Sequence, residues 1–432
     1  MHQKESLDII NDLKFCVIDL ETTGGNHNKD KIIEVGMVKI EKLKLVSEKS
    51  FLINPKIQIP EFIQKLTNIS QKDVADSPII EDVIDEILEF IGEDIIVAHN
   101  TSFDVPFLNG ILKNLKREEL SNKVICTNVM TKHLIPEILN SNLNYMSRLF
   151  NVTHSKAHRA QDDAVATADL LITYLNIFIE KGIKKVNQLY YPKNKFELDR
   201  VHFNSTETEL SYVINTINKL KTPVTITVKG KRGLILAVIP LSEPRDEYSF
   251  AHEVISKLEW EIITVKFAKP FIDGLFQFNN HYLKFDSGIR SQILNYLIEK
   301  YKTLTQPTKI EDIDFVIGHH LIREQVVVYS FLNLNTNSKS IFKIPAQKKK
   351  LYQYLNNQVN RFEQNQKGRK KHFLNQDVIP LIENYLQSSK EKNSFLYLER
   401  RFIKNEKELS IKTIEDFVRA NRDINFFPME HL

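Results

Sequence analysis

The sequence has few of the features that mark exported, disulfide-linked or membrane-spanning proteins. Only two of its 432 residues are cysteine, and neither Cys16 nor Cys126 has a partner at the spacing of a redox pair or a zinc site. We therefore expect both thiols to be buried and the protein to be cytoplasmic. The longest apolar run, Leu234 to Ile239, is far shorter than the roughly 20 residues that span a bilayer, so we expect no contact with the membrane interior.

Further absences narrow the functional classes. The first ten residues, MHQKESLDII, lack the apolar core of a signal peptide, so export is not expected. We find no internal repeat and no low-complexity tract in the sequence. The GxxxxGK[ST] phosphate loop is also missing, so we expect no helicase motor within this chain.

The composition that is present is globular, with an uneven distribution of charge. Hydrophobic residues make up 42% and charged residues 26%, and a chain of this length is expected to form at least two domains. Residues 1–183 contain 20 Lys and Arg against 27 Asp and Glu, a net charge of −7, which leaves +11 for the remainder of the +4 total. This asymmetry suits an acidic metal-binding part joined to a part that holds a polyanion.

The first part of the chain, residues 1–183, is expected to be a mixed α/β domain. Residues 14–18, KFCVI, predict a buried central strand, and Ser77 with Pro78 predicts the start of a helix. The apolar spacing predicts strands at 14–18, 32–40, 50–53, 95–98 and 124–127, and helices at 77–90, 103–115 and 160–181.

The second part is expected to be an α+β domain of unknown topology. A polar and weakly periodic stretch at 184–209 predicts a linker, and residues 210–432 would then form a basic accessory domain. Alternation at 224–228, the KGKRG segment and the apolar run that follows predict a β-hairpin with a basic tip. We also predict strands at 260–267 and 325–331 and a helix at 351–362.

Acidic residues gather where the predicted strands of the first domain end. Asp19 and Glu21 are two residues apart and so project to the same face of the strand, at the sheet edge where open α/β sheets bind ligands. Two carboxylates there repel each other unless a cation neutralises them, and Mg²⁺ or Mn²⁺ are the ions that carboxylate oxygens select. A solvated sheet edge is the alternative for this pair alone.

Three more residues favour the metal site. Asp104 lies in IVAHNTSFDVPFL and Asp163 in HRAQDDA, each near the start of a predicted helix. His158 is expected in the loop before the last helix, overhanging the site. Taken singly, each acid could be a helix-capping residue and the histidine an ordinary loop residue. Together they favour a catalytic site.

The segments DLETTG, HNTSFD and HRAQDDA resemble the three exonuclease motifs of the DnaQ-like DEDDh superfamily. This superfamily of 3′-5′ exonucleases includes the proofreading epsilon subunit of bacterial DNA polymerase III. The resemblance covers residues 13–180 and fills all five family positions, with Asp19, Glu21, Asp104, His158 and Asp163. It implies a ribonuclease H-like fold, with a mixed central sheet flanked by helices.

The resemblance also implies a mechanism. The four acids would hold two divalent ions, Mg²⁺ or Mn²⁺, and His158 would act as general base. The product would be a nucleoside 5′-monophosphate. One departure from the family is Asn68, where relatives often have glycine, but asparagine tolerates a positive φ, so we expect the turn to be kept.

The resemblance further implies a binding pocket for the terminal nucleotide. The backbone around Thr22 and Thr23 would meet the terminal 3′ hydroxyl, and His99, Asn100 and Phe103 would line the pocket. For Phe103, packing in the protein core is an equal alternative.

The second domain carries a basic segment. Residues 339–373 contain ten Lys or Arg and one acid, interleaved with aromatic residues, a composition that suits phosphate neutralisation and base stacking. The candidate nucleic-acid contacts are Lys348, Lys349, Lys350, Arg369, Lys370 and Lys371. The alternative is that the aromatic residues belong to a core. The segment VNQLYYP at 186–192 is loosely similar to peptides that dock on the sliding clamp, so a sliding clamp or a DNA polymerase is a candidate partner.

We therefore expect a metal-dependent 3′-5′ exonuclease that acts on a single-stranded 3′ end of DNA, in proofreading, repair or end trimming. A 3′-5′ exoribonuclease of the same superfamily is the nearest alternative, since the 2′ hydroxyl of RNA is sensed by pocket geometry. A non-catalytic nucleic-acid-binding scaffold is the second alternative.

Overall fold

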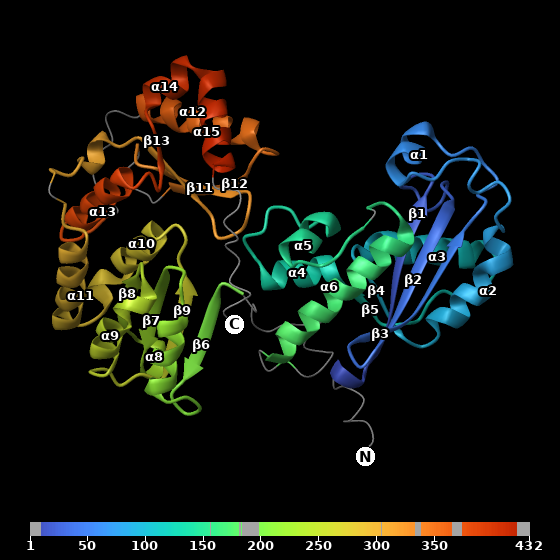
Figure 1. The fold of residues 1–432 in the computed structure, drawn as a ribbon, viewed down its shortest axis with the longest axis horizontal. Helices are drawn as coiled ribbons and strands as arrows, with labels where there is room; N and C mark the ends of the chain where they lie inside the picture. Colours follow the sequence, from blue (N-terminus) through green and yellow to red (C-terminus); the bar gives the residue numbers. More distant parts are fainter. Residues whose placement is uncertain are drawn as a thin grey trace. The chain divides into compact units, whose positions relative to one another are not determined.

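A computed structural model describes residues 10–155, 157–180, 183, 198–303, 305–332, 338–364 and 374–420. The chain divides into two compact units, Met1–Glu197 and Leu198–Leu432. Each unit is described by itself below (Figure 1).

Unit 1 is built on a five-stranded mixed sheet in the order β3-β2-β1-β4-β5. β1 pairs antiparallel with β2, and β2 antiparallel with β3, whereas β4 and β5 run parallel to β1. The central strands are almost wholly buried, which is why their sequences are nearly continuous apolar runs. The strands are β1 (Lys14–Thr22), β2 (Ile32–Glu41), β3 (Lys44–Leu52), β4 (Ile95–Ala98) and β5 (Val124–Cys126).

Helices cover both faces of this sheet. One face packs against α2 and α3 through a core that includes Ile18, Val83 and Phe107, and α6 lies along the opposite face, against β1, β2 and β3. The helices are α1 (Glu61–Thr67), α2 (Ile80–Ile91), α3 (Thr101–Asn114), α4 (Thr127–Leu134), α5 (Leu143–Leu149) and α6 (Ala160–Glu180), with a short 3-10 turn η2 (Ile10–Asp12) before β1. The predicted ribonuclease H-like architecture, a mixed sheet flanked by helices, is confirmed.

Two predicted elements of unit 1 were wrong in extent. The third strand begins at Lys44, because the charged stretch at 41–49 is largely β3 itself, an edge strand whose polar side chains face outward. The turn before it uses Lys42 and Leu43, both with positive φ. The first long helix begins at Ile80 and not at Ser77, whose hydroxyl instead donates to the carbonyl oxygen of Asp73.

Unit 2 contains two four-stranded antiparallel sheets, in the orders β6-β9-β7-β8 and β12-β11-β10-β13. The predicted α+β class is confirmed. The strands are β6 (Arg200–Asn204), β7 (Val224–Lys229), β8 (Ile235–Leu241), β9 (Ile262–Phe267), β10 (Phe315–His319), β11 (Gln325–Ser330), β12 (Ser338–Lys343) and β13 (Leu396–Leu398).

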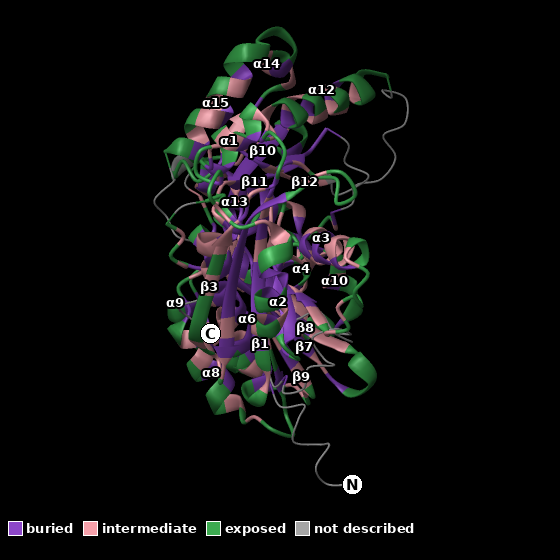
Figure 2. Cartoon of the chain, turned by 90° about the vertical axis from the view of Figure 1, so that its right-hand side faces the viewer, coloured by how far each residue is buried: buried purple, intermediate pink, exposed green. Residues whose placement is uncertain are grey.

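Both sheets of unit 2 contribute to one apolar core, which contains Ile226 of β7 and Val316 of β10. A second core, around Leu355, packs three helices, α12, α14 and α15, against the second sheet. Figure 2 shows the result, with strands mostly buried and helices that alternate buried and exposed faces. The helices are α8 (Leu210–Lys219), α9 (Pro244–Ile255), α10 (Ile272–His281), α11 (Ser287–Lys300), α12 (Lys348–Gln364), α13 (Ile379–Glu391), α14 (Arg400–Asn405) and α15 (Lys407–Arg419), with 3-10 turns η3 (Lys231–Gly233), η4 (Tyr282–Lys284) and η5 (Ile310–Asp312).

The stretch 184–209, predicted to be a linker, is not a linker throughout. Its residues 200–204 form β6, an edge strand that pairs only with β9. Val201 and Phe203 alternate with polar residues, but only Phe203 is buried, and so short an alternation at the end of a polar stretch is a weak signal for a strand. Residues 184–197 lie outside the described part of the chain.

No helix among the described residues has both the length and the apolar run needed to cross a bilayer. Of the two cysteines, Cys16 is buried as predicted. Cys126 is only partly buried, at the end of the edge strand β5.

Candidate active site

Asp19 and Glu21 lie near the end of β1, on the face of the sheet that α6 covers. Their partners on β2 are Gly36 and Glu34, while the alternate residues Ile18 and Leu20 point into the opposite core. The alternation of strand side chains therefore separates the acids from the apolar residues, as the two-residue spacing predicted. A register shift between Glu21 and Thr22 ends the regular pairing just beyond the acids.

Asp104 reaches the same strand end from α3. It lies in the first turn of that helix with only 4% of its surface exposed. Its Oδ1 accepts a hydrogen bond from the backbone N–H of Leu20, at 3.1 Å, which places the Asp104 carboxyl between the positions of Asp19 and Glu21 along β1. The structure thus brings together three acids that are up to 85 positions apart in the sequence.

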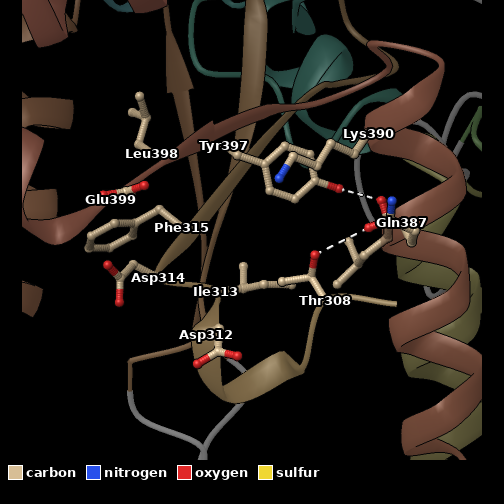
Figure 3. Close-up of a pocket in the computed structure, with 11 residues that line it drawn as sticks. Thr308, Asp312, Ile313, Asp314, Phe315, Gln387, Lys390, Tyr397, Leu398 and Glu399 are labelled. Atoms are coloured by element: carbon tan, nitrogen blue, oxygen red, sulfur yellow. Dashed lines mark hydrogen bonds between the residues drawn. The ribbon is translucent and has the colours of Figure 1, made fainter. Parts of the chain in front are cut away.

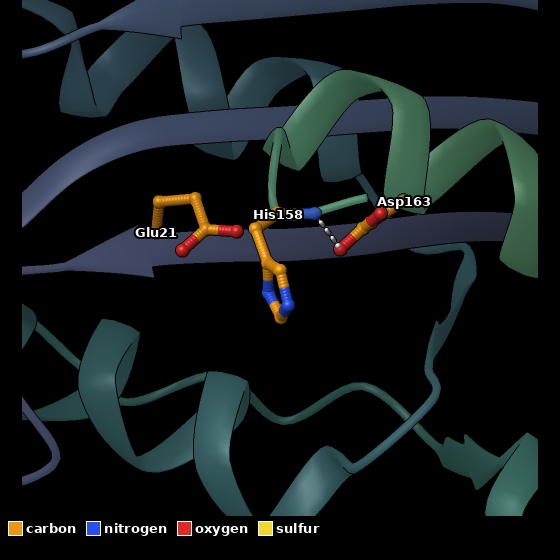
Figure 4. A group of neighbouring side chains, drawn as sticks. All are labelled: Glu21, His158 and Asp163. Carbon is orange, nitrogen blue, oxygen red and sulfur yellow. Dashed lines mark hydrogen bonds between the residues drawn. The ribbon is translucent and has the colours of Figure 1, made fainter. Parts of the chain in front are cut away.

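Asp163 and His158 arrive from the start of α6 and the loop before it. His158 is exposed and has a φ of 64°, so the loop makes a left-handed turn at the predicted general base. Its backbone N–H donates to Oδ2 of Asp163 at 3.3 Å (Figure 4). Glu21, His158 and Asp163 each offer one potential ligand atom, and these atoms lie within 4.8 Å of one another. The five predicted catalytic residues therefore meet in one region.

Burial raises the pKa values of three of these acids, and repulsion between carboxylates adds to it for Asp19 and Glu21. The pKa of Asp19 lies well above its ordinary value. Burial is the largest cause, and repulsion from nearby carboxylates adds to it, those of Asp104, Asp163, Glu21 and Glu34. Burial and the nearby acids raise the pKa of Glu21 to about 8, and burial raises that of Asp104 to about 7. A divalent cation bound among these carboxyl groups would reduce the repulsion between them and so stabilise the folded protein.

Strand β2 fixes the start of α6 above the acids. Glu34, 3% exposed, accepts hydrogen bonds from Arg159 Nε at 3.1 Å, from Arg159 Nη2 at 2.8 Å and from the backbone N–H of Ala160 at 2.9 Å. A Cβ on Gly36 would lie 2.2 Å from the Ala160 carbonyl oxygen, so only glycine permits this close approach. Sequence reasoning missed both residues. The available signal was a charged residue and a glycine within the otherwise apolar run of 32–38.

The predicted nucleotide contacts Thr22 and Thr23 are buried beside the acids. The hydroxyl of Thr22 donates to the carbonyl oxygen of Gly24 at 2.6 Å. The backbone N–H of Thr23 donates to the carbonyl oxygen of Lys31 at 2.8 Å, and its hydroxyl accepts from the Lys31 N–H at 2.9 Å. These bonds close the turn that follows β1.

His99, Asn100 and Phe103 differ in what they can offer a nucleotide. The ring of His99 is buried, with Nδ1 2.9 Å from the Thr127 hydroxyl and Nε2 2.6 Å from the Ser141 carbonyl oxygen, so neither ring nitrogen is left for a nucleotide. Asn100 is exposed just before α3. Phe103 is half-buried and packs at the edge of the core, with its ring centroid 4.9 Å from that of Phe107.

The basic segment of unit 2 is described only in part. Lys348 forms an ion pair with Glu415 at 2.9 Å, and Lys349 and Lys350 are exposed on the first turn of α12. Arg369, Lys370 and Lys371 lie outside the described residues. Four of the five aromatic residues of this segment pack against the second core of unit 2, which agrees with the alternative interpretation; they are Phe342, Tyr352, Tyr354 and Phe362. Phe373 lies outside the described residues.

Unit 2 also has a small hollow beside its edge strand β13 (Figure 3). The acidic side chains that line the hollow do not meet at one point. Asp314 accepts a hydrogen bond from the backbone N–H of Arg400 at 2.7 Å and forms an ion pair with the guanidinium group of that residue. Within the described part of the chain, three side chains of the His, Cys, Asp and Glu types that could share a metal ion lie together in unit 1 and not in this hollow.

Comparisons with known proteins assign unit 1 independently. Residues 16–171 match the RNase T family model, described as an exonuclease. A PolC-type DNA polymerase III from Caldanaerobacter subterraneus is 36% identical over 222 residues, which are 51% of this chain and 15% of the relative. The 3′-5′ exonuclease DinG from Staphylococcus aureus is 31% identical over 185 residues, 43% of this chain and 21% of the relative. The chain thus spans only about a seventh to a fifth of these relatives.

Among solved structures, exonuclease X in complex with 5′ overhanging duplex DNA is 29% identical, with a TM-score of 0.32, and covers 38% of this chain and 91% of its own. The family match covers the part of the chain that carries DLETTG, HNTSFD and HRAQDDA. Residues 16–171 are therefore an exonuclease domain of the DnaQ-like DEDDh family.

Proposed function

We propose that this protein hydrolyses the terminal phosphodiester bond at the 3′ end of a DNA strand, with divalent cations, and releases nucleoside 5′-monophosphates. The observation that carries the proposal is that four carboxyl groups and one exposed histidine lie together at the end of the central strand β1. The 3′-5′ direction is supported by the similarity to DinG, which is a 3′-5′ exonuclease.

The donor set fits Mg²⁺ or Mn²⁺. Asp19, Glu21, Asp104 and Asp163 offer only carboxylate oxygens, the ligands that these hard ions prefer. The raised pKa values of Asp19, Glu21 and Asp104 mean that the fold holds these acids close together at an electrostatic cost, which bound cations would offset. Two such ions, when bound, supply activation of the attacking water and stabilisation of the leaving 3′ oxygen.

The protein's own groups would complete the reaction. His158 is exposed on its loop, so water can reach its imidazole, and histidine is the side chain that most often serves as a general base. The carboxylates, once engaged with cations, are poor proton acceptors. We therefore assign proton removal from the attacking water to His158.

DNA is the proposed substrate, because one relative is a PolC-type DNA polymerase. That name also supports a replication or repair setting, with a DNA polymerase as partner. The segment 186–192, with its loose similarity to clamp-docking peptides, lies outside the described residues. We propose unit 2 as an accessory part that guides substrate or partner, with Lys349 and Lys350 as exposed cations.

The decisive experiment follows a 5′-labelled single-stranded DNA, and a matched RNA, with the full chain in Mg²⁺ or Mn²⁺. We expect a ladder that shortens from the 3′ end of the DNA and is absent with EDTA and in an Asp19→Ala, Glu21→Ala double variant. Faster shortening of the RNA would reassign the substrate to RNA. No cleavage of either strand would favour the binding scaffold and contradict the proposal.

A further inference from the structure

The carboxylate of Asp163 has a second partner that none of the three motifs contains. His154 lies in the loop before α6, and its Nε2 is 2.5 Å from Oδ1 of Asp163. Only 6% of the His154 side chain and 13% of the Asp163 side chain are exposed. This contact is therefore shielded from water, unlike the exposed ring of His158 four residues later.

The direction of this hydrogen bond follows from the chemistry of its partners. An ionised carboxylate can only accept, so Nε2 of His154 must carry the hydrogen and donate it. The other oxygen of Asp163, Oδ2, accepts from the backbone N–H of His158 at 3.3 Å. Each oxygen of Asp163 thus has one donor, and both donors come from the same loop.

We propose that His154 is a positioning residue for Asp163, which fixes the rotamer of this carboxylate so that it presents its free lone pairs to the cations. The proposal rests on the proposed metal-dependent function. A hydrogen-bonded partner of a metal ligand restricts its rotation and maintains its geometry, and losing such a partner typically lowers metal affinity or activity by about 10-fold to 100-fold. Asp163 needs this restraint because it projects from the first turn of α6, next to a loop, and not from a strand.

Three substitutions separate hydrogen bonding from packing. In His154→Gln the amide nitrogen can occupy the position of Nε2 and still donate. In His154→Asn the side chain is too short to reach Oδ1. In His154→Leu the apolar bulk remains but the donor is lost. His154 of the full chain is the only position changed in each variant, and His252→Leu, an exposed histidine on α9, is the matched control.

The measurements are the concentration of Mn²⁺ that gives half of the metal-induced rise in Tm, the turnover of labelled DNA, and the Tm in EDTA. We expect the Leu and Asn variants to need about 10-fold to 100-fold more Mn²⁺, with turnover reduced and little change of Tm in EDTA. The Gln variant should stay near the wild type in both metal response and turnover, as should His252→Leu.

Two outcomes would overturn the proposal while leaving the function intact. One is a Leu variant with wild-type Mn²⁺ response and turnover. The other is equal loss in the Leu, Asn and Gln variants together with a lower Tm in EDTA, which would assign His154 to packing. A wild-type chain that neither cleaves nucleic acid nor responds to Mn²⁺ would overturn both the function and this role.

Discussion

Replacing one acid of the cluster with a neutral side chain should stabilise the protein when no metal is bound. At pH 7, Glu21 of the unfolded chain is ionised, since its ordinary pKa is 4.5, whereas in the folded chain burial and the neighbouring acids raise this pKa to about 8. Folding therefore requires uptake of a proton. The cost is about 1.4 kcal/mol for each pH unit between 4.5 and 7, or about 3 kcal/mol in total.

The substitution Glu21→Gln removes this cost and keeps the shape of the side chain. In EDTA at pH 7 we expect the Tm of unit 1, which has 197 residues, to rise by roughly 6 to 12 °C, because about 1 kcal/mol shifts the Tm of a unit of this size by roughly 2 to 4 °C. Glu118→Gln, an exposed residue with no charged partner in the site, is the matched control and should change the Tm little.

The pH dependence of the stabilisation by Glu21→Gln gives a stricter test, because the raised pKa of Glu21 fixes the direction in which the stabilisation changes with pH. A carboxyl whose pKa is raised on folding has no effect below pH 4.5, where it is protonated in both states. Its cost grows between pH 4.5 and about 8 and is constant above. The stabilisation by Glu21→Gln should follow the same course, and scanning calorimetry in EDTA from pH 4 to 9 would measure it.

Metal should reverse the order of stability. Mn²⁺ neutralises the cluster in the wild type and binds the variant less well, so saturating metal should raise the Tm of the wild type more than that of Glu21→Gln. A Tm difference that does not depend on pH, or a variant less stable than the wild type in EDTA at pH 8, would refute the electrostatic account of the site.

Further predictions concern the elements that hold the site. Gly36→Ala should lower both turnover and Tm, because its Cβ would lie 2.2 Å from the Ala160 carbonyl oxygen, whereas a Cβ at Gly25 meets nothing within 4 Å, so Gly25→Ala is the control for stability. His158→Ala should leave the Mn²⁺-induced rise in Tm largely unchanged but slow single-turnover hydrolysis by about 100-fold to 10,000-fold; turnover near that of the wild type would remove this histidine from the mechanism. Treatment with EDTA should abolish activity, and added Mg²⁺ or Mn²⁺ should restore it; activity that persists in EDTA would contradict the metal requirement.

The exonuclease family and the clustering of the acids in unit 1 could be predicted from sequence because these residues lie near the ends of strongly patterned elements. Asp19 and Glu21 lie at the end of the buried strand β1, and the expectation that Asn68 keeps a left-handed turn is met, since it ends α1 with a φ of 57°. The contacts of Glu34 and His154 could not be predicted in this way. Glu34 contacts Arg159, 125 positions away, and His154 contacts Asp163, 9 positions away. The spacing of apolar residues along the chain gives no information about such polar contacts.

The topology of unit 2 could not be predicted from the sequence for a related reason. β13 pairs with β10 although about 80 residues separate them, and β9 inserts between β6 and β7 in the sheet. Strand pattern shows which face of a strand is buried but not which strand lies beside it. Short edge strands such as β6 and β13 bury few side chains, so their sequences give only a weak signal for a strand.

The ion pair between Glu34 and Arg159 has two consequences that oppose each other at the active site. Glu34 anchors the start of α6, but its charge also adds to the forces that raise the pKa values of Asp19 and Glu21. Arg159 lowers the pKa of Glu21 and donates two hydrogen bonds to Glu34. A buried anchor that carried negative charge without this partner would weaken the cluster it positions. Arg159 is therefore expected both to hold the loop before α6 and to limit the rise in the pKa of Glu21, one of the acids proposed to bind the cations.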